Sequence, residues 1–282
     1  MGTVGKKPGL FTDIGKKAKD LLQKGFSTGH MLFFSHVTST GMCLSTNSIM
    51  SEGLVVGTVS SSFKGGGVSS NISFSTLNQV TSETTYEDLI PGLKISLSAT
   101  VPDAKNLGNA EIVYQHDWVA FTALSKGLKV KPVIECTANF GSPRLCVGGS
   151  LSYDSANNAV TSTIGGIGYT AAPISLGLLC NMKEHGSLSL YCLHEFTSNT
   201  SWALNLDLSR DKKISDMTIG AWHKLNSQTS IKAKVNKEGI LSALLEHELK
   251  PLVSVGLCVG LRCLPSDKEK PSIGLAVTVL SA

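Results

Sequence analysis

The chain has 282 residues, a formal net charge of +4 and a mean hydropathy of +0.13, with 41% hydrophobic but only 16% charged residues. The lysines are scattered rather than gathered in a dense basic patch, which argues against a nucleic-acid binder. No apolar run reaches the roughly 20 residues of a membrane-spanning helix. This combination is typical of a closed β-barrel in a membrane, in which apolar residues occupy every second strand position.

The first predicted element is an amphipathic helix over residues 9–25, bounded by Pro8–Gly9 and by Gly25. At 100° per residue, the apolar side chains between Leu10 and Leu22 share an arc of about 120°. This pattern fits a surface helix of an ordinary domain, a helix lying on a membrane, or a helix against the inner wall of a pore. The charged residues on the opposite side of the helix are Asp13, Lys16, Lys17, Lys19, Asp20 and Lys24.

From residue 26 onward, strand patterns alternate with turn signals. Apolar residues occupy every second position over 93–101, 201–209 and 230–236, which predicts half-buried strands. Turn sequences recur about every 13–14 residues, so we predict about 19 strands of about ten residues each. Ten residues suffice for a tilted strand to cross a bilayer, whereas the usual strand length is nearer six. Strand length therefore favours a transmembrane β-barrel over 26–282, preceded by an N-terminal segment over 1–25 that contains the helix.

The two faces of such strands meet different solvents. In a membrane barrel, the apolar face contacts lipid and the polar face contacts a water-filled lumen. Lys94, Lys232 and Lys234 would then line the pore together with the charged residues of the helix. Because basic side chains in a pore concentrate anions, we expect an anion preference. On a soluble β-sandwich the same lysines would lie on a solvent-exposed strand face, and this alternative stays open.

Three segments are similar to one family. They are the helix region 8–26, the triplet Gly92–Leu93–Lys94, and the window 223–251, which contains Ala233, Lys234, Val235 and Asn236 at the family's spacing. Together they resemble the eukaryotic mitochondrial porins, the voltage-dependent anion channels, and the plant branch most closely. The end of the chain is similar to the signal read by outer-membrane insertion machinery, with its pattern on Ser272, Gly274, Val277 and Val279.

The resemblance implies a 19-stranded barrel in the mitochondrial outer membrane, with the N-terminal helix inside the pore. It also implies voltage-gated, weakly anion-selective passage of chloride, phosphate and adenine nucleotides. The expected partners are the lipid bilayer and these permeants. Whether the chain forms a homo-oligomer stays open. Two alternatives are a related protein-translocating outer-membrane barrel and a soluble β-sandwich that binds a partner.

The sequence offers little support for an enzyme or a metal protein. Its seven histidines include no H-x-x-x-H pair, and its seven cysteines include no C-x-x-C pair. The glycines at 165–168 lack the spacing of a nucleotide-binding loop, and we interpret them as strand and turn residues. We therefore expect no catalytic residue, no cofactor and no metal.

Overall fold

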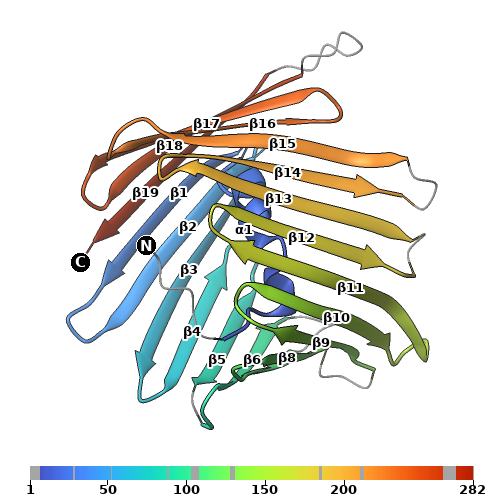
Figure 1. Ribbon diagram of the computed structural model, residues 1–282. Helices are drawn as coiled ribbons and strands as arrows, with labels where there is room; N and C mark the ends of the chain where they lie inside the picture. The colour runs from blue at the N-terminus through green and yellow to red at the C-terminus, as the bar shows by residue number, and fades with distance from the viewer. Residues whose placement is uncertain are drawn as a thin grey trace.

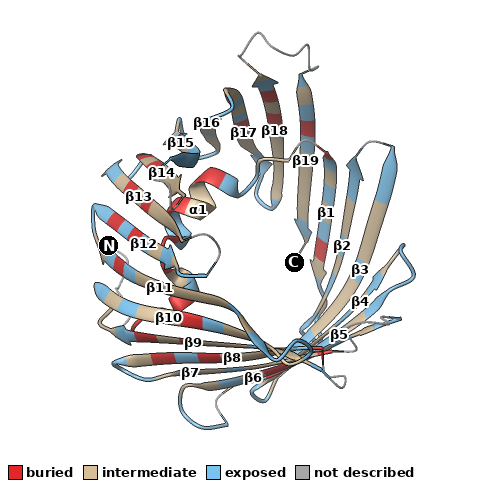
Figure 2. Ribbon diagram, turned by 90° about the vertical axis from the view of Figure 1, so that its right-hand side faces the viewer, coloured by how far each residue is buried: buried red, intermediate tan, exposed pale blue. Residues whose placement is uncertain are grey.

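Nineteen strands form one sheet that closes on itself. The computed structural model describes residues 7–27, 29–51, 53–87, 89–102, 108–127, 131–183, 186–209, 213–262 and 271–281. Figure 1 shows the tilted strands following one another around the wall, and Figure 2 looks into the ring that they make. The predicted barrel is confirmed, and a sandwich of two stacked sheets is excluded.

The strands are seven to thirteen residues long. In the first half of the chain they are β1 (His30–Val37), β2 (Met42–Ser51), β3 (Leu54–Gly65), β4 (Val68–Ser75), β5 (Val80–Glu87), β6 (Leu93–Val101), β7 (Asn109–Gln115), β8 (Val119–Lys126), β9 (Val133–Gly141) and β10 (Leu145–Asp154). In the second half they are β11 (Ala159–Ala171), β12 (Ile174–Asn181), β13 (Ser187–Thr197), β14 (Thr200–Leu208), β15 (Ile214–Lys224), β16 (Thr229–Asn236), β17 (Ile240–Lys250), β18 (Val253–Arg262) and β19 (Ser272–Ser281).

The seam of the barrel differs from every other strand pair. Each strand pairs antiparallel with the next one along the chain, but β1 and β19 pair parallel, with Met31 opposite Ala276 and Phe34 opposite Val279. An odd number of alternating strands leaves the first and last pointing the same way, so only a parallel seam can close the ring. The rim at which the odd-numbered strands end, including residue 281, is called the C-terminal rim below.

The register gives the wall two faces. Residues paired directly across two strands share a face, and the inner face is the one whose Tyr191 and Ala203 pack against the N-terminal helix. Following the pairs around the ring places Leu97 outside and Lys94 inside. Large apolar side chains on the outer face are exposed, as for Leu97 (46%) and Phe74 (56%). Such a surface suits hydrocarbon rather than water.

Charge follows the same division. Within the described strands, every Asp, Glu, Lys and Arg side chain belongs to the inner face except that of Lys250, at the end of β17. No helix in the described part of the chain is long and apolar enough to cross a membrane.

The N-terminal segment lies inside the ring (Figure 2). The sequence predicts one helix over 9–25, and this is wrong in detail, because the structure has a short 3₁₀ helix η1 (Phe11–Asp13) and a separate α1 (Lys16–Gln23). The break is at Ile14, which is extended, and at Gly15, which has a φ of 74°. A Cβ on Gly15 would lie 2.6 Å from ring carbons of Tyr191, so close contact with the wall interrupts the helix there.

A lysine on the outer face should be far more harmful than one on the inner face. Leu97 and Ser98 are neighbours near the middle of β6 but belong to opposite faces. We expect Leu97→Lys to reduce the free energy of unfolding in liposomes by about 2–4 kcal/mol, because an ammonium group would enter hydrocarbon. Ser98→Lys should change it little, since the side chain reaches the aqueous lumen. Equal losses in urea titrations of both variants would contradict the assignment of faces.

Candidate functional site

The N-terminal segment is held to the inner wall by its apolar side. Phe11, Ile14, Ala18 and Leu22 are only 6%, 4%, 2% and 3% exposed, as the apolar arc in the sequence predicts. The short helix η1 contacts β9 and β10, whereas α1 contacts β13, β14 and β15. The segment therefore lies across the inner face of the strands from β9 to β15, and its other side faces the lumen.

Inward-facing glycines make this close approach possible. A Cβ on Gly177 of β12 would lie 2.7 Å from the nitrogen of Gly15, and a Cβ on Gly220 of β15 would lie 2.8 Å from Leu22. A helix can approach a sheet this closely only where side chains are absent. We call the glycines beneath the segment the glycine track, and its members are Gly148, Gly166, Gly168, Gly177 and Gly220.

Polar contacts fix the position of the segment along this track. The side chain of Asn139 is fully buried, and its Nδ2 donates a hydrogen bond of 2.7 Å to the carbonyl of Gly9. The backbone N–H of Leu10 donates a hydrogen bond of 2.9 Å to the carboxylate of Asp13. This bond satisfies a backbone donor at the start of η1. The ammonium of Lys19 lies 4.5 Å from the ring centre of Tyr191, a cation–π contact.

The helix lysines differ in their surroundings. The ammonium of Lys16 is 2.9 Å from the carboxylate of Asp13, and this hydrogen bond raises the lysine pKa above its ordinary value. Lys19 is half-buried at the wall, where desolvation lowers its pKa although Asp207 acts in the opposite sense. Lys24 pairs with Asp20 at 2.8 Å. Unlike Lys19, the side chains of Lys16, Lys17 and Lys24 are exposed, so their charges face the open lumen.

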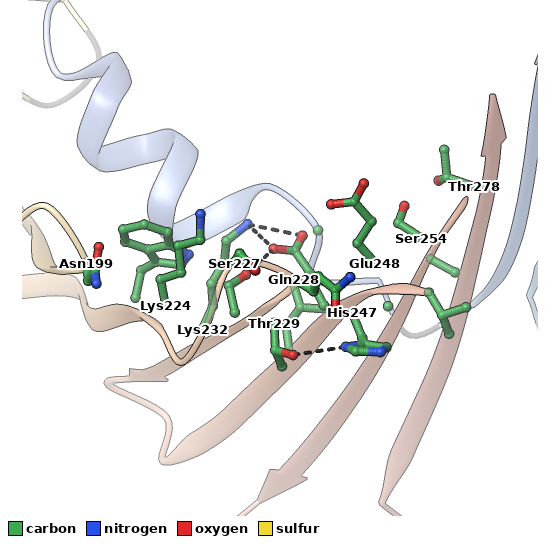
Figure 3. A pocket seen from close by; sticks show the side chains of 18 of the residues that line it. Asn199, Lys224, Ser227, Gln228, Thr229, Lys232, His247, Glu248, Ser254 and Thr278 are labelled. Atoms are coloured by element: carbon green, nitrogen blue, oxygen red, sulfur yellow. Dashed lines mark hydrogen bonds and ion pairs between the residues drawn. The ribbon is translucent and has the colours of Figure 1, made fainter. Parts of the chain in front are cut away.

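A cavity of about 590 Å³ lies where the N-terminal segment leaves α1 (Figure 3). Gly25 borders it from the segment, and Lys224, Lys232, Glu246 and Glu248 border it from the wall. Lys232 forms an ion pair of 3.3 Å with Glu246. This corner of the lumen therefore carries charges of both signs and can attract either end of a dipolar solute.

Acidic side chains outnumber basic ones on the wall itself. Three ion pairs join strands in the first half of the chain: Lys64–Glu87 at 3.0 Å reaches across β4 from β3 to β5, whereas Lys94–Glu87 at 3.9 Å and Lys126–Glu135 at 3.1 Å join neighbouring strands. The inward acidic residues of the described strands are Glu83, Glu87, Glu111, Glu135, Asp154, Glu195, Asp207, Asp216, Glu246 and Glu248. The inward basic residues are Lys64, Lys94, Lys126, Lys224, Lys232, Lys234 and Arg262.

The N-terminal segment has the opposite balance. Between residues 7 and 27, the lysines at 7, 16, 17, 19 and 24 outnumber the aspartates at 13 and 20. The segment thus brings a surplus of positive charge into a barrel whose wall is acidic. Neither the helix pattern nor the strand pattern reveals this division, because it becomes visible only when each charged residue is assigned to a face.

The other residues singled out in the sequence take varied positions. Lys94, Lys232 and Lys234 belong to the inner face, and the ammonium of Lys234 lies 4.4 Å from the ring centre of Phe26. The residues of the family motifs and of the terminal pattern divide by face, with Lys94, Lys234, Asn236, Ser272 and Gly274 inside and Leu93, Ala233, Val235, Val277 and Val279 outside.

Two motif glycines occupy positions where a side chain would not fit. Gly92 has a φ of 84°, and a Cβ there would collide with the carbonyl of Gln115. Gly274 faces the carbonyl of Ser27, so the linker that follows α1 runs directly over β19.

The sequence did not predict the roles of Asn139 and Tyr191, since each looks like any polar or aromatic residue of a strand. Among the described residues, no group of His, Cys, Asp and Glu could hold a metal ion.

A closed barrel with an apolar exterior, a charged interior and a segment packed within it defines a membrane pore of the β-barrel class. The family model described as eukaryotic porin matches residues 7–269. Mitochondrial outer membrane protein porin 1 of Oryza sativa subsp. japonica is 32% identical over 272 residues, or 96% of this chain and 98% of the relative. Mitochondrial outer membrane protein porin 2 of Arabidopsis thaliana is 31% identical over 278 residues, or 97% and 99%. The chain belongs to the eukaryotic porin family.

Filling the glycine track should displace the N-terminal segment. We expect Gly177→Val to reduce stability by about 1–3 kcal/mol, because the new side chain would overlap Gly15. A cysteine introduced at the buried position 18 should then react faster with a water-soluble maleimide. Gly165→Val is the control, since Gly165 belongs to the outer face and a Cβ there comes no closer than 3.8 Å to another residue. Unchanged labelling in Gly177→Val would show that the track does not set the segment's position.

Proposed function

We propose that the chain forms a voltage-gated, weakly anion-selective pore for small metabolites and ions across the mitochondrial outer membrane. The observation that carries the proposal is the closed barrel with its apolar outer face and its charged, segment-bearing interior. Family membership supports it, as do relatives that are named mitochondrial outer membrane porins. The permeants we propose are chloride, phosphate and adenine nucleotides, and a homo-oligomer is the assembly to test by crosslinking in membranes.

The proposed anion preference depends on the N-terminal segment more than on the wall. The wall alone carries a surplus of carboxylates, so without the segment it would concentrate cations. In salt solution a charge acts only over about 10 Å at 0.1 M, so charges nearest the permeating ion count most. The lysines of α1 project from a helix that lies inside the wall (Figure 2) and are therefore well placed to act on passing anions.

Planar-bilayer recording tests the function directly. The purified barrel should insert, conduct, and give a reversal potential of anionic sign across a KCl gradient, with a conductance that falls at high voltage. A barrel that does not conduct, or whose current clearly favours cations, would contradict the proposal.

Removing lysine charge should lower the anion preference. We expect the combined replacement of Lys16, Lys17, Lys94, Lys232 and Lys234 by glutamine to move the reversal potential to zero or to the cationic side, because the lumen becomes more acidic. The matched control replaces the same five residues by arginine, which preserves their charge. An unchanged reversal potential in the glutamine variant would show that these residues do not set selectivity.

Removing wall carboxylates should have the opposite effect. Glu83 and Glu111 face inward on β5 and β7, opposite Asn71 and Ser96. We expect Glu83→Gln together with Glu111→Gln to increase the anion preference, measured again as the reversal potential. Lys250→Gln is the control, since Lys250 is outside the lumen, and it should leave selectivity unchanged. If the double variant became less anion-selective, our charge balance of the lumen would be wrong.

A further inference from the structure

Three histidine rings on the outer face share one arrangement at the C-terminal rim. The Nδ1 atom of His223 lies 2.9 Å from the hydroxyl of Thr200, and that of His247 lies 2.9 Å from the hydroxyl of Thr229. The Nδ1 atom of His36 lies 3.2 Å from the hydroxyl of Ser281 across the seam. Each partner is the residue directly opposite on the neighbouring strand, so the same pair is built three times.

The register places all three pairs on the side away from the lumen. His247 pairs with Thr229 and Val255, whereas its neighbour Glu246 pairs with the inward Ser230. Figure 3 shows the Thr229–His247 pair on one side of β17 and the side chain of Glu248 on the other. His223 is likewise paired with the outward Thr200, and His36 with the outward Ser281, so all three rings belong to the outer face.

Aromatic side chains mark the level of this rim in the membrane. Every odd-numbered strand from β1 to β13 carries an outward aromatic residue near its end, and β15 and β17 carry His223 and His247 in that place. Such girdles lie at the boundary between hydrocarbon and headgroups. The exposed aromatic residues of the girdle are Phe34, Phe63, Tyr86, Tyr114, Phe140, Tyr169 and Phe196.

The pairing determines which ring nitrogen is available. When a hydroxyl donates to Nδ1, the proton of the neutral ring is on Nε2, which becomes a hydrogen-bond donor. No described residue bonds the Nε2 of these three rings. The groups that accept hydrogen bonds at this depth of a bilayer are mainly the phosphate and ester oxygens of lipids, and a phosphate oxygen can only accept.

We propose that the three pairs are binding sites for phospholipid headgroups, in which each Nε2–H donates to a lipid phosphate. The inference rests on the proposed membrane location. A lipid is favoured over a free anion because the surrounding outer face is apolar and, within the described strands, carries no charged side chain except Lys250. The apolar neighbours contact the acyl chains while the ring holds the headgroup.

Native mass spectrometry of the detergent-purified protein tests the proposal, with phosphatidylcholine and phosphate-free diacylglycerol as probes. The wild-type barrel should retain phosphatidylcholine but not diacylglycerol. Replacing His36, His223 and His247 together by phenylalanine preserves the aromatic girdle but removes the ring nitrogens. Since one such hydrogen bond changes affinity by about threefold to tenfold, the retained phosphatidylcholine should fall by at least about threefold.

Two further variants make the test specific. His30→Phe is the matched control, because His30 belongs to the same outer face at the opposite rim, and it should retain lipid like the wild type. Thr200→Val with Thr229→Val keeps all three rings but removes the hydroxyls that orient His223 and His247, and retention should again fall. Circular dichroism checks that each variant is folded.

Equal retention by the triple histidine variant and the wild type would overturn the proposal. So would equal binding of diacylglycerol by the wild type, or displacement of the lipid by inorganic phosphate, which would indicate a site for free anions. Conductance separates this inference from the proposed function, since the rings lie outside the lumen. A conducting barrel with unchanged lipid retention would refute only the lipid sites, whereas a non-conducting wild type that still retains phospholipid through these rings would refute only the pore.

Discussion

Hydrocarbon offers a backbone no hydrogen-bond partner, so a sheet in a membrane cannot have an open edge. In this chain the requirement is met by the pairing of β1 with β19, the one parallel pair in the barrel. Its residues are the most distant in the sequence, and without their pairing both strands would expose unpaired N–H and C=O groups to lipid. The alternating faces, the polar lumen and the position of the N-terminal segment all depend on the ring that this seam closes.

Once the ring is closed, the contents of the lumen are determined by geometry and by side-chain size. A helix lies against a sheet only where the sheet leaves room, and here the glycine track leaves it. Because of this close fit, the helix is interrupted at Gly15, where it contacts the wall. The same contact brings several lysines into a barrel with an acidic wall, so packing and selectivity have a common origin in the N-terminal segment.

Much of the fold could be predicted from the sequence, because period-two alternation and turn residues are local signals. The sequence predicts a strand over 93–101, and β6 has the same bounds. The break at Gly15 could not be predicted, since it depends on Tyr191, far away in the sequence. The surplus of carboxylates on the inner wall could not be predicted either, because Glu83 and Glu111 lie in strands whose weak alternation does not assign them to a face.

The parallel seam has a consequence for how the molecule can be assembled. The chain must be complete before its last strand can meet its first, and by then all eighteen antiparallel strand pairs can already have formed. The linker over Gly274 passes directly beside the closing strand, and Lys7 reaches Gln115 at the far end of the lumen. The N-terminal segment can therefore reach the inner wall in only two ways, through the gap between β1 and β19 before the seam forms or through an open end of the finished ring.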